Sequence, residues 1–228
     1  MLDRMRTRLA RYSAAAFVVA AALTLIVGTA GTASAQARGK NPRGQTPRII
    51  GSKVINGKTY PVIYVPGALP PRTHANLASA SPSTIVNQHS GKCAEVYHSS
   101  KSNGANVDQW SCNGTATQSW RLDLAYFDQY GNPVGEIINE NSGKCFEVYN
   151  WGAGNGSNVD QWGCAPISQM HGNQLWDVNG ELLEAVGASN YRNLLVVAEV
   201  YNWSTSNGGN VDIWQYLADS NQHWTQSL

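Results

Sequence analysis

Pairs of acidic side chains recur at a constant spacing in the C-terminal part of this 228-residue chain. Each pair combines a glutamate that precedes Val-Tyr with an aspartate two positions before a tryptophan, and successive copies lie 52 residues apart. The glutamates are Glu95, Glu147 and Glu199, the aspartates are Asp108, Asp160 and Asp212, and the tryptophans are Trp110, Trp162 and Trp214. Two carboxylates can hydrolyse a glycoside when different surroundings separate their pKa values. Three near-identical copies argue against such catalysis, because they place similar carboxylates in similar surroundings.

The histidines give no sign of a catalytic centre. His89, His98, His171 and His223 do not recur in register with the acidic pairs. Neither a Ser-His-Asp triad nor a set of metal ligands therefore emerges from the pattern. The sequence predicts a protein without enzymatic activity, and it calls for no metal or cofactor.

All eight tryptophans occupy positions of the repeat. Three of them close the copies as Gln-x-Trp: Gln118 precedes Trp120, Gln174 precedes Trp176, and Gln222 precedes Trp224. We expect these three to pack in the core, since they repeat with the fold. Trp151 and Trp203 follow Tyr-Asn and could either wall a pocket or cover a hairpin. Successive Gln-x-Trp motifs lie 56 and 48 residues apart instead of 52, and we ascribe this slip in spacing to an insertion near residues 124–133.

The internal period predicts tandem supersecondary units made of β-strands. Short apolar runs alternate with turn signals such as Asn179-Gly180, and about four strands fit each copy. Residues 181–188 are expected to be a strand, because glycine lies close to both ends of this short segment. Three copies without polar caps do not suit an open solenoid, so we expect them to close into a threefold assembly without exposed edges.

The four cysteines fit the same repeat. Cys93 and Cys112 are 19 residues apart, as are Cys145 and Cys164, whereas the third copy has lost both members of the pair. A joint loss is expected if each bridge lies within its own copy. We therefore predict the disulfides Cys93–Cys112 and Cys145–Cys164. A zinc site is disfavoured because no Cys-x-x-Cys spacing exists.

These motifs resemble the ricin-type β-trefoil lectin family over residues 82–228. The matching signs are Cys-x-acid-Val, a glycine-rich loop, Val-x-x-Trp-x-Cys and Gln-x-Trp. The resemblance implies an all-β fold, a β-trefoil with three repeats near residues 82–133, 134–184 and 185–228. It further implies a six-stranded barrel capped by three hairpins, with one shallow sugar pocket in each lobe. Such proteins bind galactose-like sugars or xylan and arabinan chains.

The resemblance also assigns site residues. A carboxylate accepts hydrogen bonds from sugar hydroxyls, an aromatic ring covers the apolar face of the sugar, and an amide serves another hydroxyl. The implied carbohydrate-binding residues are Glu147, Asp160, Trp162, Asn173 and Gln174 in the second lobe, Glu199, Asp212, Trp214, Asn221 and Gln222 in the third, and Glu95, Asp108, Trp110 and Gln118 in the first. Glutamate stands where the family more often has aspartate, and Thr117 replaces the amide of the first lobe, so we rank the second lobe first. An alternative for the acidic pairs is that they are solvated turn residues.

The N-terminus carries the marks of a bacterial-type signal peptide, predicted to span residues 1–35. Four arginines precede an apolar run at residues 14–27, and the run is followed by Ala33-Ser34-Ala35. Cleavage after Ala35 or Ala37 would release a secreted protein with no remaining membrane segment. An uncleaved anchor is the alternative, although the run is shorter than the ~20 residues of a membrane span.

Charge separates the rest of the chain into two parts. Residues 36–80 hold seven basic and no acidic residues, whereas residues 81–228 have a net charge of −9. The negative part would repel phosphates, which disfavours nucleic acid as a partner. We interpret residues 36–81 mainly as a solvated arm or linker. The arm contains a hairpin signal at Asn56-Gly57, and it could bind an anionic cell-wall polymer.

The expected partner of the domain is an oligosaccharide or polysaccharide bound by a monomer. A protein-binding trefoil, such as an inhibitor or toxin-associated subunit with degenerate pockets, is the alternative.

Overall fold

The computed structural model describes residues 48–55, 57–64, 82–169, 171–226 and 228. The predicted signal peptide at residues 1–35 and, of the expected arm or linker at residues 36–81, residues 36–47, 56 and 65–81 lie outside this part of the chain. Within the described residues, no helix combines the length and apolarity that a membrane span requires.

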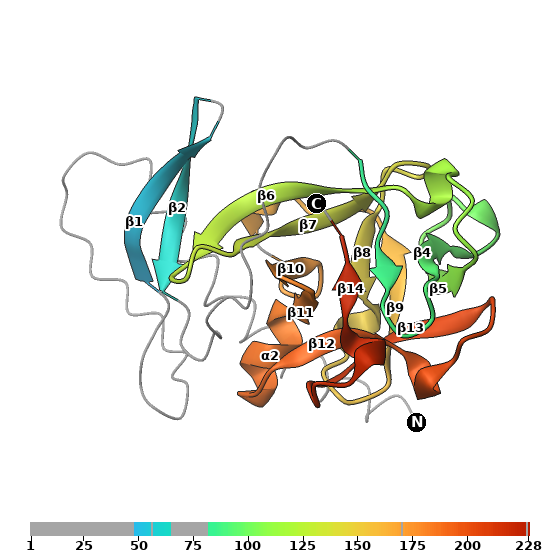
Figure 1. Cartoon of the computed structure of the whole chain (residues 1–228). Helices are drawn as coiled ribbons and strands as arrows, with labels where there is room; N and C mark the ends of the chain where they lie inside the picture. The colour runs from blue at the N-terminus through green and yellow to red at the C-terminus, as the bar shows by residue number, and fades with distance from the viewer. Residues whose placement is uncertain (1–47, 56, 65–81, 170, 227) are drawn as a thin grey trace, which may run out of the picture.

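Each lobe contains four strands, as predicted (Figure 1), although the third lobe begins with β11 at Leu182, three residues before the repeat boundary expected at residue 185. The strands of the first lobe are β3 (Val86–Asn87), β4 (Cys93–Val96), β5 (Ala105–Trp110) and β6 (Trp120–Asp128). Those of the second are β7 (Pro133–Asn139), β8 (Cys145–Val148), β9 (Ser157–Trp162) and β10 (Leu175–Asn179). Those of the third are β11 (Leu182–Ala185), β12 (Val196–Val200), β13 (Gly209–Gln215) and β14 (Trp224–Thr225). The fold is an all-β trefoil.

Short helical turns recur at matching places in the lobes. One set follows the second strand of each lobe: η1 (Tyr97–Ser99), η3 (Tyr149–Trp151) and η5 (Tyr201–Trp203). The other precedes the fourth strand: η2 (Ala116–Gln118), η4 (Ile167–Gln169) and η6 (Ser220–Gln222). One α-helix among the described residues, α2 (Val186–Arg192), joins β11 to β12.

The first and fourth strands of the lobes close into a six-stranded barrel. Antiparallel pairing joins β6 to β7, β7 to β10, β10 to β11, and β14 to β3. In the first lobe, a β-bridge between Ser83 and Trp120 links the segment before β3 to the start of β6. In the third lobe, the Trp224 amide at the start of β14 donates to the Glu181 carbonyl before β11 at 2.7 Å, which completes the ring. Closure leaves no free edge within the ring, which satisfies the backbone groups that an open sheet would expose.

The second and third strands of each lobe form hairpins that cap the barrel. The pairs are β4–β5, β8–β9 and β12–β13, and the valines at their inner positions are buried. The three Gln-x-Trp tryptophans lie in the same core, as predicted, and each indole N–H donates to a backbone carbonyl of its own lobe, those of Ala94, Phe146 and Ala198. Both predicted disulfides, Cys93–Cys112 and Cys145–Cys164, are confirmed.

A ring of three asparagines joins the caps around the pseudo-threefold axis. Asn106 donates its side-chain amide to Asn210, Asn210 to Asn158, and Asn158 to Asn106, each at 2.9 Å. These residues lie at the start of β5, β9 and β13, which also pair with one another in short antiparallel stretches. Each side chain is both donor and acceptor, so the ring leaves neither role unfilled.

One detail of the sequence interpretation is wrong, and another is incomplete. The segment 181–188 is not one strand, because β11 ends at Ala185 and α2 begins at Val186. Gly187 in this helix lies so close to Gly172 that a Cβ atom would come within 2.6 Å of the Gly172 carbonyl oxygen. The slip in spacing has two sources. Gln118 and Glu147 are 29 positions apart against 25 for Gln174 and Glu199, which agrees with the insertion expected near residues 124–133. In addition, Gln174 follows Trp162 by twelve positions, whereas the corresponding distance is eight in the other lobes. The four extra residues of that step therefore lie in the loop after β9.

The Asn-Gly signal of the arm is confirmed, but the spacer interpretation is wrong for residues 48–64. They form the hairpin β1 (Arg48–Ile55) and β2 (Lys58–Tyr64), and β2 pairs in parallel with the end of β6 (Figure 1). Ile63 is buried in a small cluster with Tyr126, Val134, Leu175 and Val186. The Lys53 ammonium lies 4.3 Å from the centre of the Phe127 ring, a cation–π contact that holds the hairpin on the trefoil.

Replacing Asn158 with alanine should destabilise the trefoil. The Asn158→Ala change removes a donor from Asn106 and an acceptor from Asn210, which are half-buried. We expect a loss of about 1–3 kcal/mol in the free energy of unfolding, measured by urea denaturation. The Gln215→Ala change on the exposed end of β13 serves as control. Equal stability of the two variants would contradict a stabilising role for the ring.

Deleting residues 36–64 should leave the trefoil folded but less stable. The barrel closes through β3 and β14 without the hairpin, whereas Ile63 would no longer cover its apolar neighbours. We expect retained β-sheet circular dichroism and a lower melting temperature. An unfolded product would show instead that the hairpin is required for the barrel to form.

Candidate functional site

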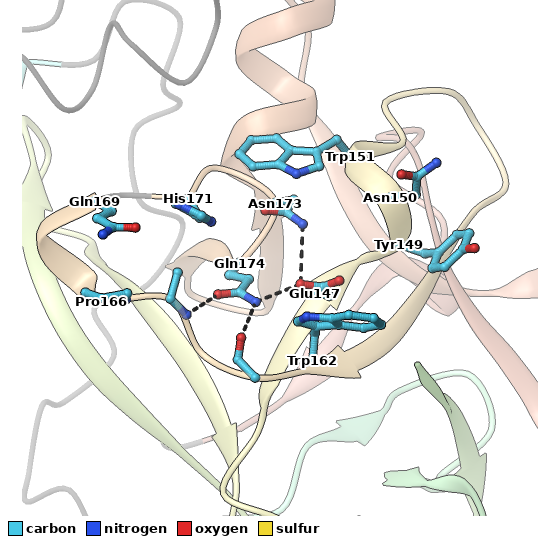
Figure 2. A pocket seen from close by; sticks show the side chains of 12 residues that line it. Glu147, Tyr149, Asn150, Trp151, Trp162, Pro166, Gln169, His171, Asn173 and Gln174 are labelled. Atoms are coloured by element: carbon cyan, nitrogen blue, oxygen red, sulfur yellow. Dashed lines mark hydrogen bonds between the residues drawn. The ribbon is translucent and has the colours of Figure 1, made fainter. Parts of the chain in front are cut away.

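A cavity of about 580 Å³ lies in the second lobe (Figure 2). Its walls come from the end of β8, from η3, from the end of β9 and from the loop that leads through η4 to β10. The lining residues are Glu147, Tyr149, Asn150, Trp151, Trp162, Gly163, Ala165, Pro166, Gln169, His171, Asn173 and Gln174. The structure thus brings together four of the five side chains assigned to this lobe from the sequence.

Glu147 is held in place by the glutamine of the Gln-x-Trp motif. The Gln174 Nε2 atom donates to Glu147 Oε2 at 2.7 Å and to the Gly163 carbonyl at 3.1 Å, while its Oε1 atom accepts from the Ala165 amide at 2.9 Å. These contacts use much of the hydrogen-bonding capacity of the amide. Gln174 therefore fixes the orientation of the Glu147 carboxylate. Glu147 is 6% exposed, and its carboxylate is the hydrogen-bond acceptor at the cavity.

The same glutamine–glutamate bond occurs in the other lobes. Gln118 donates to Glu95 at 2.8 Å, and Gln222 donates to Glu199 at 2.7 Å. Both glutamates are buried to the same degree as Glu147. The pattern shows that the motif glutamine is a positioning residue in all three lobes.

Asp160 lies opposite Glu147 in the β8–β9 pair but is not among the residues that line the cavity. It is only 1% exposed, and Asp108 and Asp212 are buried likewise in their lobes. The interpretation of the acidic pairs as solvated turn residues is therefore wrong. Burial, together with the neighbouring Glu147 carboxylate, raises the pKa of Asp160 to about 7. Burial also raises the pKa of Glu147, although the hydrogen bond from Gln174 opposes this shift.

Aromatic side chains flank the carboxylate. Figure 2 shows Trp162 on one side of Glu147 and Trp151 on the other side of Asn173. The Trp162 ring is 44% exposed, and a Cβ atom on Gly104 of the first lobe would lie 3.6 Å from it, so the first lobe supports this side chain. Trp151 lines the cavity, which resolves the open question about this residue in favour of a pocket wall.

Tyr149 is a cavity residue that the sequence analysis did not select. It is 54% exposed, and its copies Tyr97 and Tyr201 are exposed as well. The signal was available, because a tyrosine follows Glu-Val in every repeat although nothing in the core requires it. The residues that follow also adopt a rare backbone, with φ of 49° at Asn150 and 58° at Trp151. Left-handed conformations of residues other than glycine are strained and tend to occur at functional sites.

The amide before Gln-x-Trp differs in its contacts between lobes. Asn173 Nδ2 lies 3.4 Å from both Glu147 Oε2 and the Val148 carbonyl. Asn221 donates to the Val200 carbonyl at 3.0 Å. Thr117 donates its hydroxyl to the matching carbonyl of Val96 at 2.9 Å, so it reproduces the backbone contact but has no amide to offer a ligand.

Comparison with known proteins identifies the family. A family model for ricin-type β-trefoil lectin-like domains matches residues 77–162. The designed threefold-symmetric protein ThreeFoil is 32% identical, with a TM-score of 0.53 over 64% of this chain and 96% of its own. The chain belongs to the ricin-type β-trefoil lectin family.

Other solved structures share the trefoil. An exo-β-1,3-galactanase from Clostridium thermocellum is 26% identical, with a TM-score of 0.53, and the match covers 66% of this chain but only 30% of that enzyme. The agglutinin of Rhizoctonia solani is 19% identical, with a TM-score of 0.52 over 65% of this chain and 95% of its own, a likeness of fold alone. No curated protein sequence matches the chain.

The buried aspartates of this lectin domain should make its stability depend on pH. Burial and the paired glutamate raise the pKa of Asp108, Asp160 and Asp212 from 3.8 to about 7. Between these values the folded protein binds more protons than the unfolded chain, so the free energy of unfolding falls as pH rises from about 4 to about 7.

We expect a higher melting temperature at pH 5 than at pH 8, measured by scanning fluorimetry. Asp160→Asn should reduce this difference, because it removes one of the titrating groups. The Glu140→Gln change, which removes an exposed carboxylate paired with Arg121 at the surface, is the control. An unchanged pH difference in Asp160→Asn would contradict the assignment of a raised pKa to Asp160.

Proposed function

We propose that this lectin domain binds galactose-like sugars or cell-wall polysaccharides of the xylan or arabinan type, and that the second lobe is its principal site. The cavity around Glu147 carries the proposal. It combines an oriented carboxylate, the amide of Asn173 and the partly exposed ring of Trp162 within one concave surface. A carboxylate accepts hydrogen bonds from sugar hydroxyls, and an aromatic face covers the apolar side of a pyranose ring.

The proposed role is binding without catalysis. In each lobe the glutamate and aspartate are paired, but the aspartate is shielded: Asp160 is buried beside Glu147 and does not line the cavity. A glycosidase needs both carboxyl groups beside the scissile bond. The acidic pair therefore supplies one acceptor to a ligand rather than an acid and a base.

The matching residues of the first and third lobes support weaker additional sites. Glu199 with Trp214 and Asn221, and Glu95 with Trp110, repeat the arrangement of the second lobe. Single shallow sites bind weakly because they bury few atoms. Sites joined in one domain can engage the same polymer, which raises affinity by about 10²–10⁴ where the geometry permits. The export signal expected from the sequence fits a protein that acts on extracellular glycans.

Removing two glutamates together tests the proposal. We expect Glu147→Ala combined with Glu199→Ala to weaken polysaccharide binding at least tenfold, because the hydroxyl acceptors of two lobes are lost. Isothermal calorimetry with xylan, arabinan and galactan measures the change. The exposed Asp123→Ala change removes a carboxylate outside the caps and serves as the control. Unchanged affinity of the folded double variant would refute the assigned pockets.

A further inference from the structure

The loop that lengthens the second lobe also builds part of its cavity. Twelve positions separate Trp162 from Gln174, against eight between the matching residues of the first and third lobes. Ala165, Pro166, Gln169 and His171 all line the cavity, and all lie in this longer loop. The second lobe therefore has a wall that its two sister lobes cannot build from loops of their length.

The longer loop changes the surroundings of Trp151. The Trp151 ring lies 5.7 Å from that of His171, and a Cβ atom on Gly172 would approach the indole to 3.9 Å. The matching Trp203 of the third lobe contacts His89 of the first lobe and is 46% exposed. Residues of its own lobe thus hold Trp151 in the wall of the cavity (Figure 2).

A contact between two glycines fastens the longer loop to α2. The Gly187 amide donates to the Gly172 carbonyl at 3.0 Å. A Cβ atom on Gly187 would clash with that carbonyl oxygen at 2.6 Å, and one on Gly172 would lie only 3.2 Å from the Gly187 Cα atom. The loop is consequently held against α2 by backbone contacts. Preorganisation of this kind lowers the entropic cost of binding.

We propose that Trp151, Gln169 and His171 form a second sugar subsite, so that the second lobe takes a neutral oligosaccharide of at least two residues. This inference rests on the proposed function, in which Glu147, Trp162 and Asn173 hold the first sugar. The volume of about 580 Å³ exceeds the needs of one pyranose and lies in the range of about 300–1,000 Å³ that suits drug-sized ligands.

The chemistry of the lining selects a neutral ligand. Its polar groups are a carboxylate, amides, a phenol and an imidazole, and it includes no lysine or arginine. An acidic sugar would meet the Glu147 carboxylate without a cation to compensate. An indole face together with the Gln169 amide can instead cover and hydrogen-bond a second neutral ring.

The test measures how affinity depends on ligand length at this lobe alone. Glu95→Ala and Glu199→Ala are introduced together to silence the first and third lobes. Dissociation constants are measured by calorimetry for galactose against β-1,3-galactobiose and for xylose against xylobiose. In this parent protein we expect one series to gain about tenfold from the second sugar, equivalent to about 1.4 kcal/mol.

Trp151→Ala, and separately His171→Ala, should reduce the gain from the second sugar to less than about threefold while leaving the monosaccharide affinity unchanged. Deletion of residues 166–169, which restores the eight-residue spacing of the sister lobes, should do the same. Trp203→Ala is the matched control and should keep the full gain. Circular dichroism verifies that each variant is folded, and the two single substitutions decide the matter if the deletion does not fold.

The possible results distinguish a failure of the second subsite from a failure of the proposed function. A parent protein that binds both lengths equally, or a full gain in folded Trp151→Ala and His171→Ala, overturns the second subsite alone. No binding in either series, or binding that survives Glu147→Ala in the parent, overturns the proposed function itself.

Discussion

The hydrogen-bonded ring of Asn106, Asn158 and Asn210 couples the three lobes around the pseudo-threefold axis. A single repeat of about 50 residues cannot bury its apolar face, so it is stable only against its neighbours. The ring aligns the three cap hairpins, and the barrel beneath them closes through six strands that supply the tryptophans of a common core. The cavity of the second lobe depends on this closure, because part of its wall lies on the β8–β9 hairpin, whose register the assembly sets.

The contacts between lobes are nearly symmetric, and the third lobe is the one that departs from the pattern. Gln109 donates to the carbonyls of Ser204 and Ser206 in the third lobe, and Gln161 makes the same pair of bonds to a loop of the first lobe. The third lobe has buried Ile213 at this position. Val197 and Tyr216 occupy the two cysteine positions in this lobe, and the Tyr216 ring stacks on His223 and hydrogen-bonds to it. Apolar packing and an aromatic contact thus stand in for polar and covalent links without disturbing the fold.

The acidic pairs show how the fold serves the site at a cost in stability. A glutamate beside a buried aspartate places two carboxyl groups together in a poorly solvated hairpin, which favours the protonated form of the aspartate. A hydrogen bond from the motif glutamine fixes the outer carboxylate of each pair in one orientation. Buried ionisable groups are tolerated where they do something that an apolar residue cannot, and presenting an acceptor to sugar hydroxyl groups is the task that we propose for the glutamates.

The sequence by itself determined the features that repeat. The 52-residue period, the Gln-x-Trp closures and the joint loss of two cysteines specify three like units, their core tryptophans and their disulfides, because each depends on contacts within one unit or on symmetry between units. The tertiary structure decided the rest. It buried Asp160 behind Glu147, gave Gln174 a positioning role, and brought Trp151 against a loop of unequal length. It also joined the β1–β2 hairpin to β6. The period shows that the acidic pairs and the motif glutamines recur, but it does not show which way their side chains point, and the longer loop and the β1–β2 hairpin do not repeat at all. Only packing could therefore determine which of these side chains meet.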